Sequence, residues 1–395
     1  MAISKKVERF MGQASWIRKM FEEGLRLRQE PNAAPVYDFT LGNPILEPPV
    51  ALQEALRQAV LKPVPGMHRY MPNAGYPECR SQVADYLRRE LGAPIEGEDV
   101  IMTSGAAGAM NVALKSLIDP GDEVVVIAPY FPEYFFYIDN VGGVITVAES
   151  RADFDLDLAA IERAIGKRTR ALILNSPNNP TGRMYSATRL RELGELLAQK
   201  ERMAGAPITI LSDEPYRKIV FDGRTAPSVM AIHPNTIFIN SHSKDLGLPG
   251  ERIGYAVLSP THQDRLALRD ALTFCNRALG FVNAPALFQR VVAQVQEAQV
   301  DVAQYQQLRD QFCRGLAQAG LHCVQPEGAF YLFPQTPTPD DMAFVRALQR
   351  YRVLAVPGSG FGRAGHIRLI FCVTPEEIDG ALPGIKQAVA DSLNP

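Results

Sequence analysis

Several short apolar runs in this sequence end in polar residues, and these residues are the candidates for chemistry. Lys244 follows the apolar run Thr-Ile-Phe-Ile, and Asp213 closely follows the run Ile-Thr-Ile-Leu. In open α/β sheets, ligands bind beyond the carboxyl ends of the strands. If the runs are neighbouring parallel strands, their polar ends therefore meet on one rim. The polar segments after four of the runs are 104–109 (Ser-Gly-Ala-Ala-Gly-Ala), 175–182 (Asn-Ser-Pro-Asn-Asn-Pro-Thr-Gly), 212–216 (Ser-Asp-Glu-Pro-Tyr) and 240–244 (Asn-Ser-His-Ser-Lys).

One chemistry uses all of these groups. A lysine can form a Schiff base with an aldehyde cofactor, and pyridoxal phosphate needs a carboxylate at its pyridine nitrogen. A phenol and an amide beside the oxygen of the cofactor ring would tune the proton affinity of the Schiff base. An arginine with hydroxyls would hold the phosphate. The backbone N–H groups of Ser104-Gly105-Ala106, at the expected start of a helix, offer a further phosphate site.

Each segment also has an ordinary structural explanation. A lone lysine after a strand is usually a solvated surface group, and the Asp213 segment is compatible with a simple turn. Asn179 could do no more than shape its Pro-Thr-Gly turn, and Ser104 could be a helix cap. Arg368 lies in the run His-Ile-Arg-Leu-Ile-Phe and could be a paired structural arginine. The functional interpretation therefore depends on the joint occurrence of these residues.

An alternating pattern predicts the elements that position these groups. From about residue 99, short apolar runs alternate with stretches of helical spacing, which indicates a mostly parallel sheet covered on both faces. The predicted fold class is α/β, with a large domain that holds this sheet between helices and a smaller α/β domain. The expected strands are 100–103, 123–127, 144–147, 171–174, 208–211, 236–239 and 254–258, and helices are expected near 105–118, 131–140, 157–165 and 186–202.

The two ends of the chain are expected to form the smaller domain. Residues 14–30 have the spacing of an amphipathic helix, and a long helical region is expected over about 283–319. Two strand-like segments, a helix and a last helix follow. We expect an N-terminal segment over 1–45 that joins the small domain, a large cofactor-binding domain over 46–285, and a long linking helix with the small domain over 286–395.

Composition and charge exclude several classes of protein. The 395 residues carry a formal net charge of -2 and have a pI of about 6.3, so no global charge favours nucleic acid. The five cysteines are scattered without a Cys-x-x-Cys pair, which disfavours a disulfide framework or a metal site. No apolar segment has the length needed to cross a bilayer, and the N-terminus lacks the apolar core of a signal peptide. We therefore expect a cytoplasmic protein that binds no nucleic acid, membrane or metal.

These motifs resemble those of the class I/II aminotransferases, pyridoxal-phosphate enzymes of fold type I. Residues 175–182 look like the family's Asn-Pro-x-Asn-Pro-Thr-Gly. Residues 241–254, Ser-His-Ser-Lys-Asp-Leu-Gly-Leu-Pro-Gly-Glu-Arg-Ile-Gly, look like its lysine signature. The match extends over nearly the whole chain, from the Gly42-Asn-Pro loop to Arg368. It implies pyridoxal 5'-phosphate as cofactor, and an amino acid and a 2-oxo acid as substrates.

The resemblance implies a role for each matching residue. Lys244 would carry the cofactor as a Schiff base and then move the proton at the substrate α-carbon. Asp213 would pair with the pyridine nitrogen, and Arg368 would clamp the substrate carboxylate, a task that suits guanidinium geometry. Tyr70 would reach the phosphate of a neighbouring subunit, so the resemblance also implies a homodimer with shared active sites. Tyr216 and Asn179 would bond the ring oxygen, Phe131 would stack on the ring, Gly42 and Asn179 would border the substrate, and Ser104, Gly105, Ala106, Ser241, Ser243 and Arg252 would hold the phosphate.

The sequence departs from the family's bacterial aspartate enzymes at the position where they read a side-chain carboxylate. Those enzymes carry a lysine in the Gly-rich turn, and Ala107 stands there in this chain. Because alanine cannot pair with an anion, we expect a neutral or broad range of L-amino donors, with 2-oxoglutarate as an acceptor. Arg277, His68 or Arg69 could supply a cation instead, although each is expected to be a surface or interface charge.

Other functions on the same fold stay open. A carbon–sulfur β-lyase or a decarboxylase would use the same lysine and cofactor, and the motifs around Lys244 do not separate these enzymes from a transaminase. A ligand-sensing domain of a transcription regulator would carry a DNA-binding module ahead of it. About forty residues precede Gly42, fewer than such a module and its linker need. The predicted N-terminal helix could close over the substrate or brace the dimer.

Overall fold

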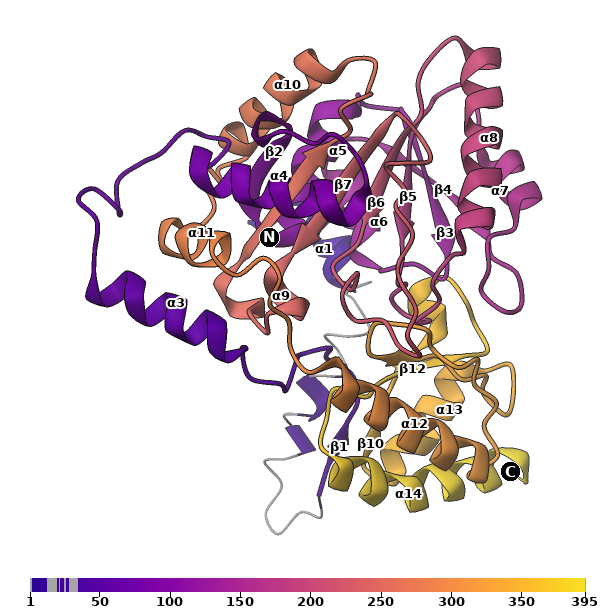
Figure 1. Cartoon of the computed structure of the whole chain (residues 1–395). Coiled ribbons are helices and arrows are strands. Elements are labelled where there is room, and N and C mark those ends of the chain that lie inside the picture. The colour runs from indigo at the N-terminus through magenta and orange to yellow at the C-terminus, as the bar shows by residue number, and fades with distance from the viewer. Residues whose placement is uncertain (1, 13–19, 21, 25, 28–34, 395) are drawn as a thin grey trace.

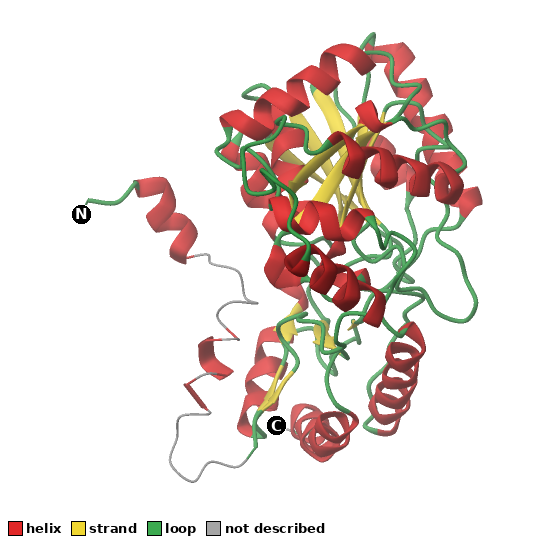
Figure 2. Cartoon of the chain, turned by 60° about the vertical axis from the view of Figure 1, so that its left-hand side comes forward, coloured by secondary structure: helices red, strands yellow, loops and turns green. Residues whose placement is uncertain are grey.

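The structure is a computed structural model that describes residues 2–12, 20, 22–24, 26–27 and 35–394. A larger part is built around one sheet, and a smaller part lies beneath it with helices α12, α13 and α14 (Figures 1 and 2). The helix predicted at 14–30 falls mostly outside the described residues. A short helix, α1 (Lys5–Gly12), precedes that segment.

A seven-stranded sheet forms the centre of the larger part (Figure 1). Each of the seven apolar runs that the sequence predicts as strands belongs to it. Of these strands, β8 runs antiparallel to both of its neighbours and the others run parallel to one another, which confirms the predicted mostly parallel sheet. In spatial order the strands are β2 (Val100–Ser104), β8 (Ile253–Leu258), β7 (Thr236–Ser241), β6 (Thr209–Asp213), β5 (Thr169–Asn175), β3 (Glu123–Ala128) and β4 (Val144–Glu149).

Helices cover both faces of this sheet because successive strand residues point to opposite sides. In β5, Ala171 and Ile173 pack in the core beneath α5, whereas Leu172 and Leu174 pack in the core beneath α8. A strand buried on both faces needs apolar residues throughout, which explains the unbroken runs in the sequence. The first face carries α5 (Gly105–Leu117), α6 (Glu133–Asn140) and α10 (Arg265–Ala278), and the second carries α7 (Leu158–Ala164), α8 (Ala187–Ala204), α4 (Pro77–Leu91) and α11 (Ala286–Ala293), with α3 (Val50–Leu61) against α11.

The smaller part combines segments from both ends of the chain. β1 (Tyr37–Asp38) pairs in parallel with β10 (Val353–Leu354). A second, antiparallel sheet has the order β11 (Val356–Pro357), β12 (Ile367–Ile370) and β9 (Tyr331–Leu332). These strands share a core with α12 (Val302–Gln318), α13 (Asp341–Arg350) and α14 (Pro375–Leu393). The domain boundaries near residues 45 and 285 stay a prediction.

The helical region predicted over 283–319 is two helices, α11 and α12, separated by eight residues, 294–301. The side chain of Asp301 accepts a hydrogen bond from the backbone N–H of Ala303 and so caps the start of α12. Aspartate is a favoured residue at this position, because its carboxylate pairs with an N–H that the helix leaves free. Within the described part of the chain, no helix has both the length and the apolar character that a bilayer span requires.

Candidate active site

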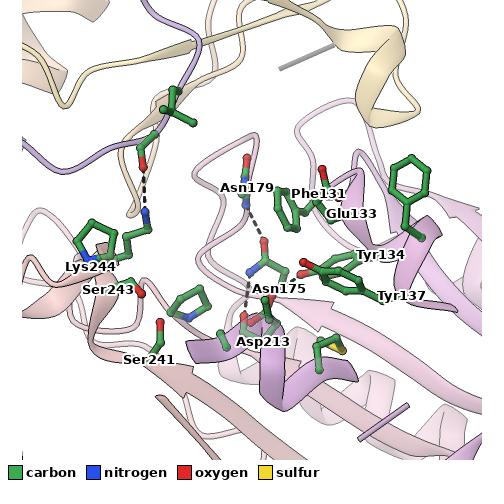
Figure 3. A pocket seen from close by; sticks show the side chains of 18 of the residues that line it. Phe131, Glu133, Tyr134, Tyr137, Asn175, Asn179, Asp213, Ser241, Ser243 and Lys244 are labelled. Atoms are coloured by element: carbon green, nitrogen blue, oxygen red, sulfur yellow. Dashed lines mark hydrogen bonds between the residues drawn. The ribbon is translucent and has the colours of Figure 1, made fainter. Parts of the chain in front are cut away.

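A cavity of about 970 Å³ lies at the carboxyl ends of β5, β6 and β7 and is lined by both parts of the chain (Figure 3). The parallel order β5-β6-β7 places Asn175 beside Asp213 in register, and β7 ends next to them at Ser241. The topology therefore brings the predicted polar segments to one rim. Of the predicted site residues, those that line the cavity are Gly42, Ala106, Phe131, Asn179, Asp213, Tyr216, Ser241, Ser243, Lys244, Arg252 and Arg368.

Lys244 lies in α9 (His242–Asp245), the short helix directly after β7. Its Nζ donates a hydrogen bond to the backbone oxygen of Gly42, at 2.9 Å. Burial lowers the pKa of the Lys244 amine to about 8, and the positive charges of Arg252 and Arg368 act in the same direction. A larger share of this amine is therefore neutral near physiological pH than of an ordinary lysine, as a nucleophile or a base requires.

Asp213 ends β6 and lies on the floor of the cavity. Tyr134 donates its hydroxyl hydrogen to Oδ2 of Asp213 at 2.5 Å, and Oδ1 has no hydrogen-bond partner among the described residues. Burial raises the pKa of the Asp213 carboxyl to about 6, and the Tyr134 hydrogen bond opposes this rise. A buried carboxylate oxygen without a partner is costly, so a protonated nitrogen at this position would relieve the cost.

Asn175 and Tyr134 support the floor of the site, and the sequence analysis assigned neither a role. Asn175 donates from Nδ2 to the backbone oxygen of Asp213 at 2.8 Å and accepts from the backbone N–H of Asn179 at 2.7 Å. It therefore fixes the Asn-Pro-Thr-Gly loop against β6. Tyr134 lies three residues after Phe131, in the first turn of α6. This short spacing from a predicted site residue was the signal in the sequence that could have identified Tyr134.

A cradle that would suit an anion lies where β2 passes into α5. Gly105 has a φ of +70°, and a Cβ there would come within 2.9 Å of Nη2 of Arg252. The guanidinium therefore lies against the backbone at the N-terminus of α5, where N–H groups and the helix dipole favour an anion. Ser104 makes no side-chain cap hydrogen bond, so the simple cap interpretation is wrong for its side chain. Ser241 and Ser243 line the cavity as well.

Arg368 belongs to β12 and is 2% exposed. It donates from Nη1 to Oδ1 of Asn179 at 3.1 Å and from Nη2 to the backbone oxygen of Thr40. Its guanidinium lies between the rings of Tyr331 and Phe361, with each ring centroid 4.9 Å away. No acidic side chain among the described residues forms an ion pair with Arg368, which argues against a purely structural pair and leaves its charge available to a carboxylate ligand.

Tyr331 is a second residue that the sequence analysis did not assign. Its hydroxyl lies 2.5 Å from the hydroxyl of Tyr216, and a Cβ on Gly42 would come within 2.7 Å of it. Glycine at position 42 is therefore required by the close approach of the Gly42 loop to this tyrosine. The sequence signal was weak, because Tyr331 stands in an apolar run that predicts only a strand.

Several predicted residues lie away from the cavity of this chain. Tyr70 is 92% exposed, and together with His68 and Arg69 it lines a separate hollow beside residues 281–286. The guanidinium of Arg277 lies over the ring of Phe274, at 5.6 Å from its centroid. Ser104 and Gly105 border the cradle but do not line the cavity itself.

Comparisons with known proteins agree with this arrangement. The family model described as aminotransferase class I and II matches residues 34–385. The aspartate/prephenate aminotransferase of Thermus thermophilus is 31% identical over 365 residues, which cover 87% of this chain and 88% of that protein. An amino transferase from Eubacterium rectale has a crystal structure with a TM-score of 0.95 and 35% identity over 99% of both chains. The aspartate aminotransferase of Thermus thermophilus with maleate gives a TM-score of 0.86 at 28% identity, over 98% of this chain and 100% of that one.

Proposed function

Because the chain belongs to the class I and II aminotransferases, which use pyridoxal phosphate, we propose that it moves the amino group of a neutral or broad range of L-amino acids to a 2-oxo acid such as 2-oxoglutarate. The observation that carries this proposal is the convergence of Lys244, Asp213 and Arg368 on one cavity. An amine, a ring-nitrogen partner and a carboxylate clamp are the three groups that the reaction needs from the protein.

The residues present fit pyridoxal phosphate. The unpaired Oδ1 of Asp213 offers an acceptor for a protonated pyridine nitrogen, and the cradle of Arg252 and the α5 N-terminus offers an anion site. When bound, the cofactor supplies an electron sink for the charge that develops at the substrate α-carbon. The proposed contacts are Asp213 to the pyridine nitrogen, Tyr216 and Asn179 to the ring oxygen, Phe131 to the ring face, and Ser104, Gly105, Ala106, Ser241, Ser243 and Arg252 to the phosphate.

Lys244 would hold the cofactor covalently and then carry the proton at the substrate α-carbon. Its amine pKa of about 8 allows it to take up and return a proton near neutral pH. The 2.9 Å hydrogen bond to the Gly42 oxygen supports this role, because it fixes Nζ next to the loop that would border the substrate. Arg368 would orient the substrate through its carboxylate, with Asn179 beside it.

The cations that line the cavity support a donor without a side-chain carboxylate. Among the described lining residues, the lysine and arginine side chains are those of Lys244, Arg252 and Arg368, and each has a proposed role at the cofactor or the α-carboxylate. Ala107 lines the cavity where the related aspartate enzymes place a lysine. A side-chain carboxylate would therefore find no cation of its own among the described residues.

The proposal also includes a cytoplasmic homodimer in which Tyr70 reaches the phosphate of the neighbouring subunit. The position of Tyr70 supports this, because its side chain is 92% exposed and lies away from the cavity of its own chain, where a neighbouring subunit could meet it. The proposed domain division, with boundaries near residues 45 and 285, belongs to the same proposal. The mass of the purified protein in solution, and its change in Tyr70→Ala, would test the dimer.

The test of the function is the absorbance of the purified protein with single amino acids and no oxo acid. Transamination converts the bound cofactor to pyridoxamine phosphate, whereas a lyase or decarboxylase leaves its aldehyde form. We expect conversion with several neutral donors and restoration by 2-oxoglutarate. A persistent aldehyde band, with release of ammonia and pyruvate or of carbon dioxide, would overturn the proposal.

A further inference from the structure

Glu133 is the first residue of α6 and lines the cavity beside Phe131, across from Lys244 (Figure 3). Its side chain is partly buried. Within the described part of the chain, no hydrogen-bond donor or cation pairs with its carboxylate. In its lack of a partner Glu133 differs from Asp213, which accepts a hydrogen bond from Tyr134 and has a proposed role at the cofactor.

An unpaired carboxylate in this position costs free energy. Burial raises the pKa of the Glu133 carboxyl above its ordinary value, since removal of water disfavours the charged form. Lys244, Arg252 and Arg368 line the same cavity but form no ion pair with Glu133, and each has another proposed task. A cation on a bound ligand would supply the missing partner.

Besides Glu22, Tyr134 and Tyr137, many of the residues that line the cavity together with Glu133 are apolar. They include Ala107 and Met110 of α5 and the rings of Phe131 and Phe136. α1 adds a further apolar surface to the cavity with Val7, Phe10 and Met11. A ligand side chain that crosses this surface and ends at Glu133 would need an apolar stem and a polar end.

α1 packs against α6 mainly through the ring of Phe10. The ring of Phe10 packs edge-on against Phe135 and Phe136, with centroids 5.6 and 5.4 Å apart. Lys6 forms an ion pair with Asp139 in the last turn of α6, with 2.5 Å between Nζ and Oδ2. The helix that carries Glu133 therefore also holds the apolar cover over the same space.

We propose that Glu133 is a specificity-determining residue that favours amino donors with an apolar stem and a terminal cation, such as an ω-ammonium group, and disfavours donors with a terminal carboxylate. This inference rests on the proposed function and narrows its broad donor range. The physical reason is Coulombic: a partly buried carboxylate attracts a cation at its rim and repels an anion, and reduced access to water strengthens both effects. The donor would lie along the α1 and α6 surface with its charged end at Glu133.

Three donors with stems of similar length test the inference. L-Lysine, L-norleucine and L-2-aminoadipate differ at the end of the side chain, which is cationic, neutral or anionic. For each donor, kcat/KM of the first half-reaction is measured by cofactor absorbance in the wild-type holoenzyme and in Glu133→Gln. We expect the wild-type order lysine, norleucine, aminoadipate. In Glu133→Gln the lysine-to-norleucine ratio should fall about tenfold, mainly through KM, as for the loss of one partly buried ion pair.

Asp139→Asn is the matched control, because it removes another α6 carboxylate and the Lys6 pair but keeps the Glu133 charge. It should leave the lysine-to-norleucine ratio within about twofold of wild type, as is usual for an exposed pair. An unchanged ratio in Glu133→Gln, or a wild-type preference for aminoadipate, would overturn the inference while transamination itself stands. If no amino acid converts the cofactor, the proposed function fails and this inference fails with it.

Discussion

Replacement of Asp213 by asparagine should stabilise the cofactor-free protein while it abolishes turnover. The carboxylate is buried, and its Oδ1 has no partner among the described residues. Asparagine has the same shape, its oxygen can still accept the hydrogen bond of Tyr134, and it carries no charge. The change therefore removes the cost of a buried anion and keeps the one strong contact that the side chain makes.

The magnitude follows from the pKa of Asp213, which burial raises from its ordinary value of 3.8 to about 6. A difference of about 2 in pKa corresponds to about 3 kcal/mol between the two protonation states. Because the folded protein holds this proton more tightly than the unfolded chain, the wild type loses stability as pH rises from about 4 to above 6. Asp213→Asn lacks this loss, so its advantage should be near zero at pH 4, about half developed at pH 5 and about 3 kcal/mol at pH 8.

The assay is urea unfolding of cofactor-free protein, followed by circular dichroism at pH 4, 5 and 8. Glu214→Gln is the matched contrast, because Glu214 is an equally buried carboxylate on the next residue but has partners in Arg217, at 2.8 Å, and Ser212, at 2.6 Å. Its loss removes the closer of the two counter-charges of the buried Arg217, which keeps Glu90 at 3.3 Å, and should destabilise the protein by about 2 kcal/mol. An Asp213→Asn advantage that does not grow with pH, or a less stable variant at pH 8, would refute the reasoning.

Three further predictions concern the ligand contacts. Arg368→Lys should lower kcat/KM for L-amino acids by about ten- to a hundredfold, because lysine cannot make the two-pronged contact with a carboxylate; a change below threefold would count against the clamp. Covalent uptake of pyridoxal phosphate should quicken as pH rises through about 8, the pKa of Lys244, because the neutral amine is the nucleophile. Stopped-flow absorbance measures the rate of uptake, and a pH-independent rate would contradict the prediction. Gly42→Ala should lower kcat/KM about tenfold, because the new Cβ would lie 2.7 Å from the Tyr331 hydroxyl, whereas Gly250→Ala, which meets no atom within 4 Å, should keep the wild-type value.

The sequence was most informative where function and burial impose strict local patterns. Most strands of the main sheet are buried on both faces, so each of them appears as an apolar run whose end could be read directly. The edge strand β4 is the exception, because it is partly exposed. Asp213 ends β6, and Lys244 and Asn179 lie within four residues after β7 and β5. Parallel neighbours bring such ends to one rim. The fold class followed from these two facts together with the family motifs, and most of the predicted site residues line the cavity.

The sequence was least informative about charged groups of the same type. Asp213, Glu214 and Glu133 are all acidic residues near the site. The sequence assigned a role to Asp213 alone, and nothing in the immediate neighbours of Glu214 and Glu133 shows which of them has a partner. The structure leaves one oxygen of Asp213 unpaired, places Glu214 against Arg217, and leaves Glu133 without a partner among the described residues. Pairing and burial, rather than residue type, give these three carboxylates different chemistry.

The contacts that only the tertiary structure decided join residues far apart in the chain. Tyr134 reaches Asp213 over a separation of 79 residues, Tyr216 meets Tyr331 over 115, and Arg368 meets Asn179 over 189. By itself the sequence determined the elements and the reactive groups at their ends, because backbone periodicity and burial are local properties. It could not determine these pairs, because each pair depends on how the smaller part packs over the sheet or on how a helix returns across the sheet. Side-chain periodicity along the chain does not encode which distant residues such packing brings into contact.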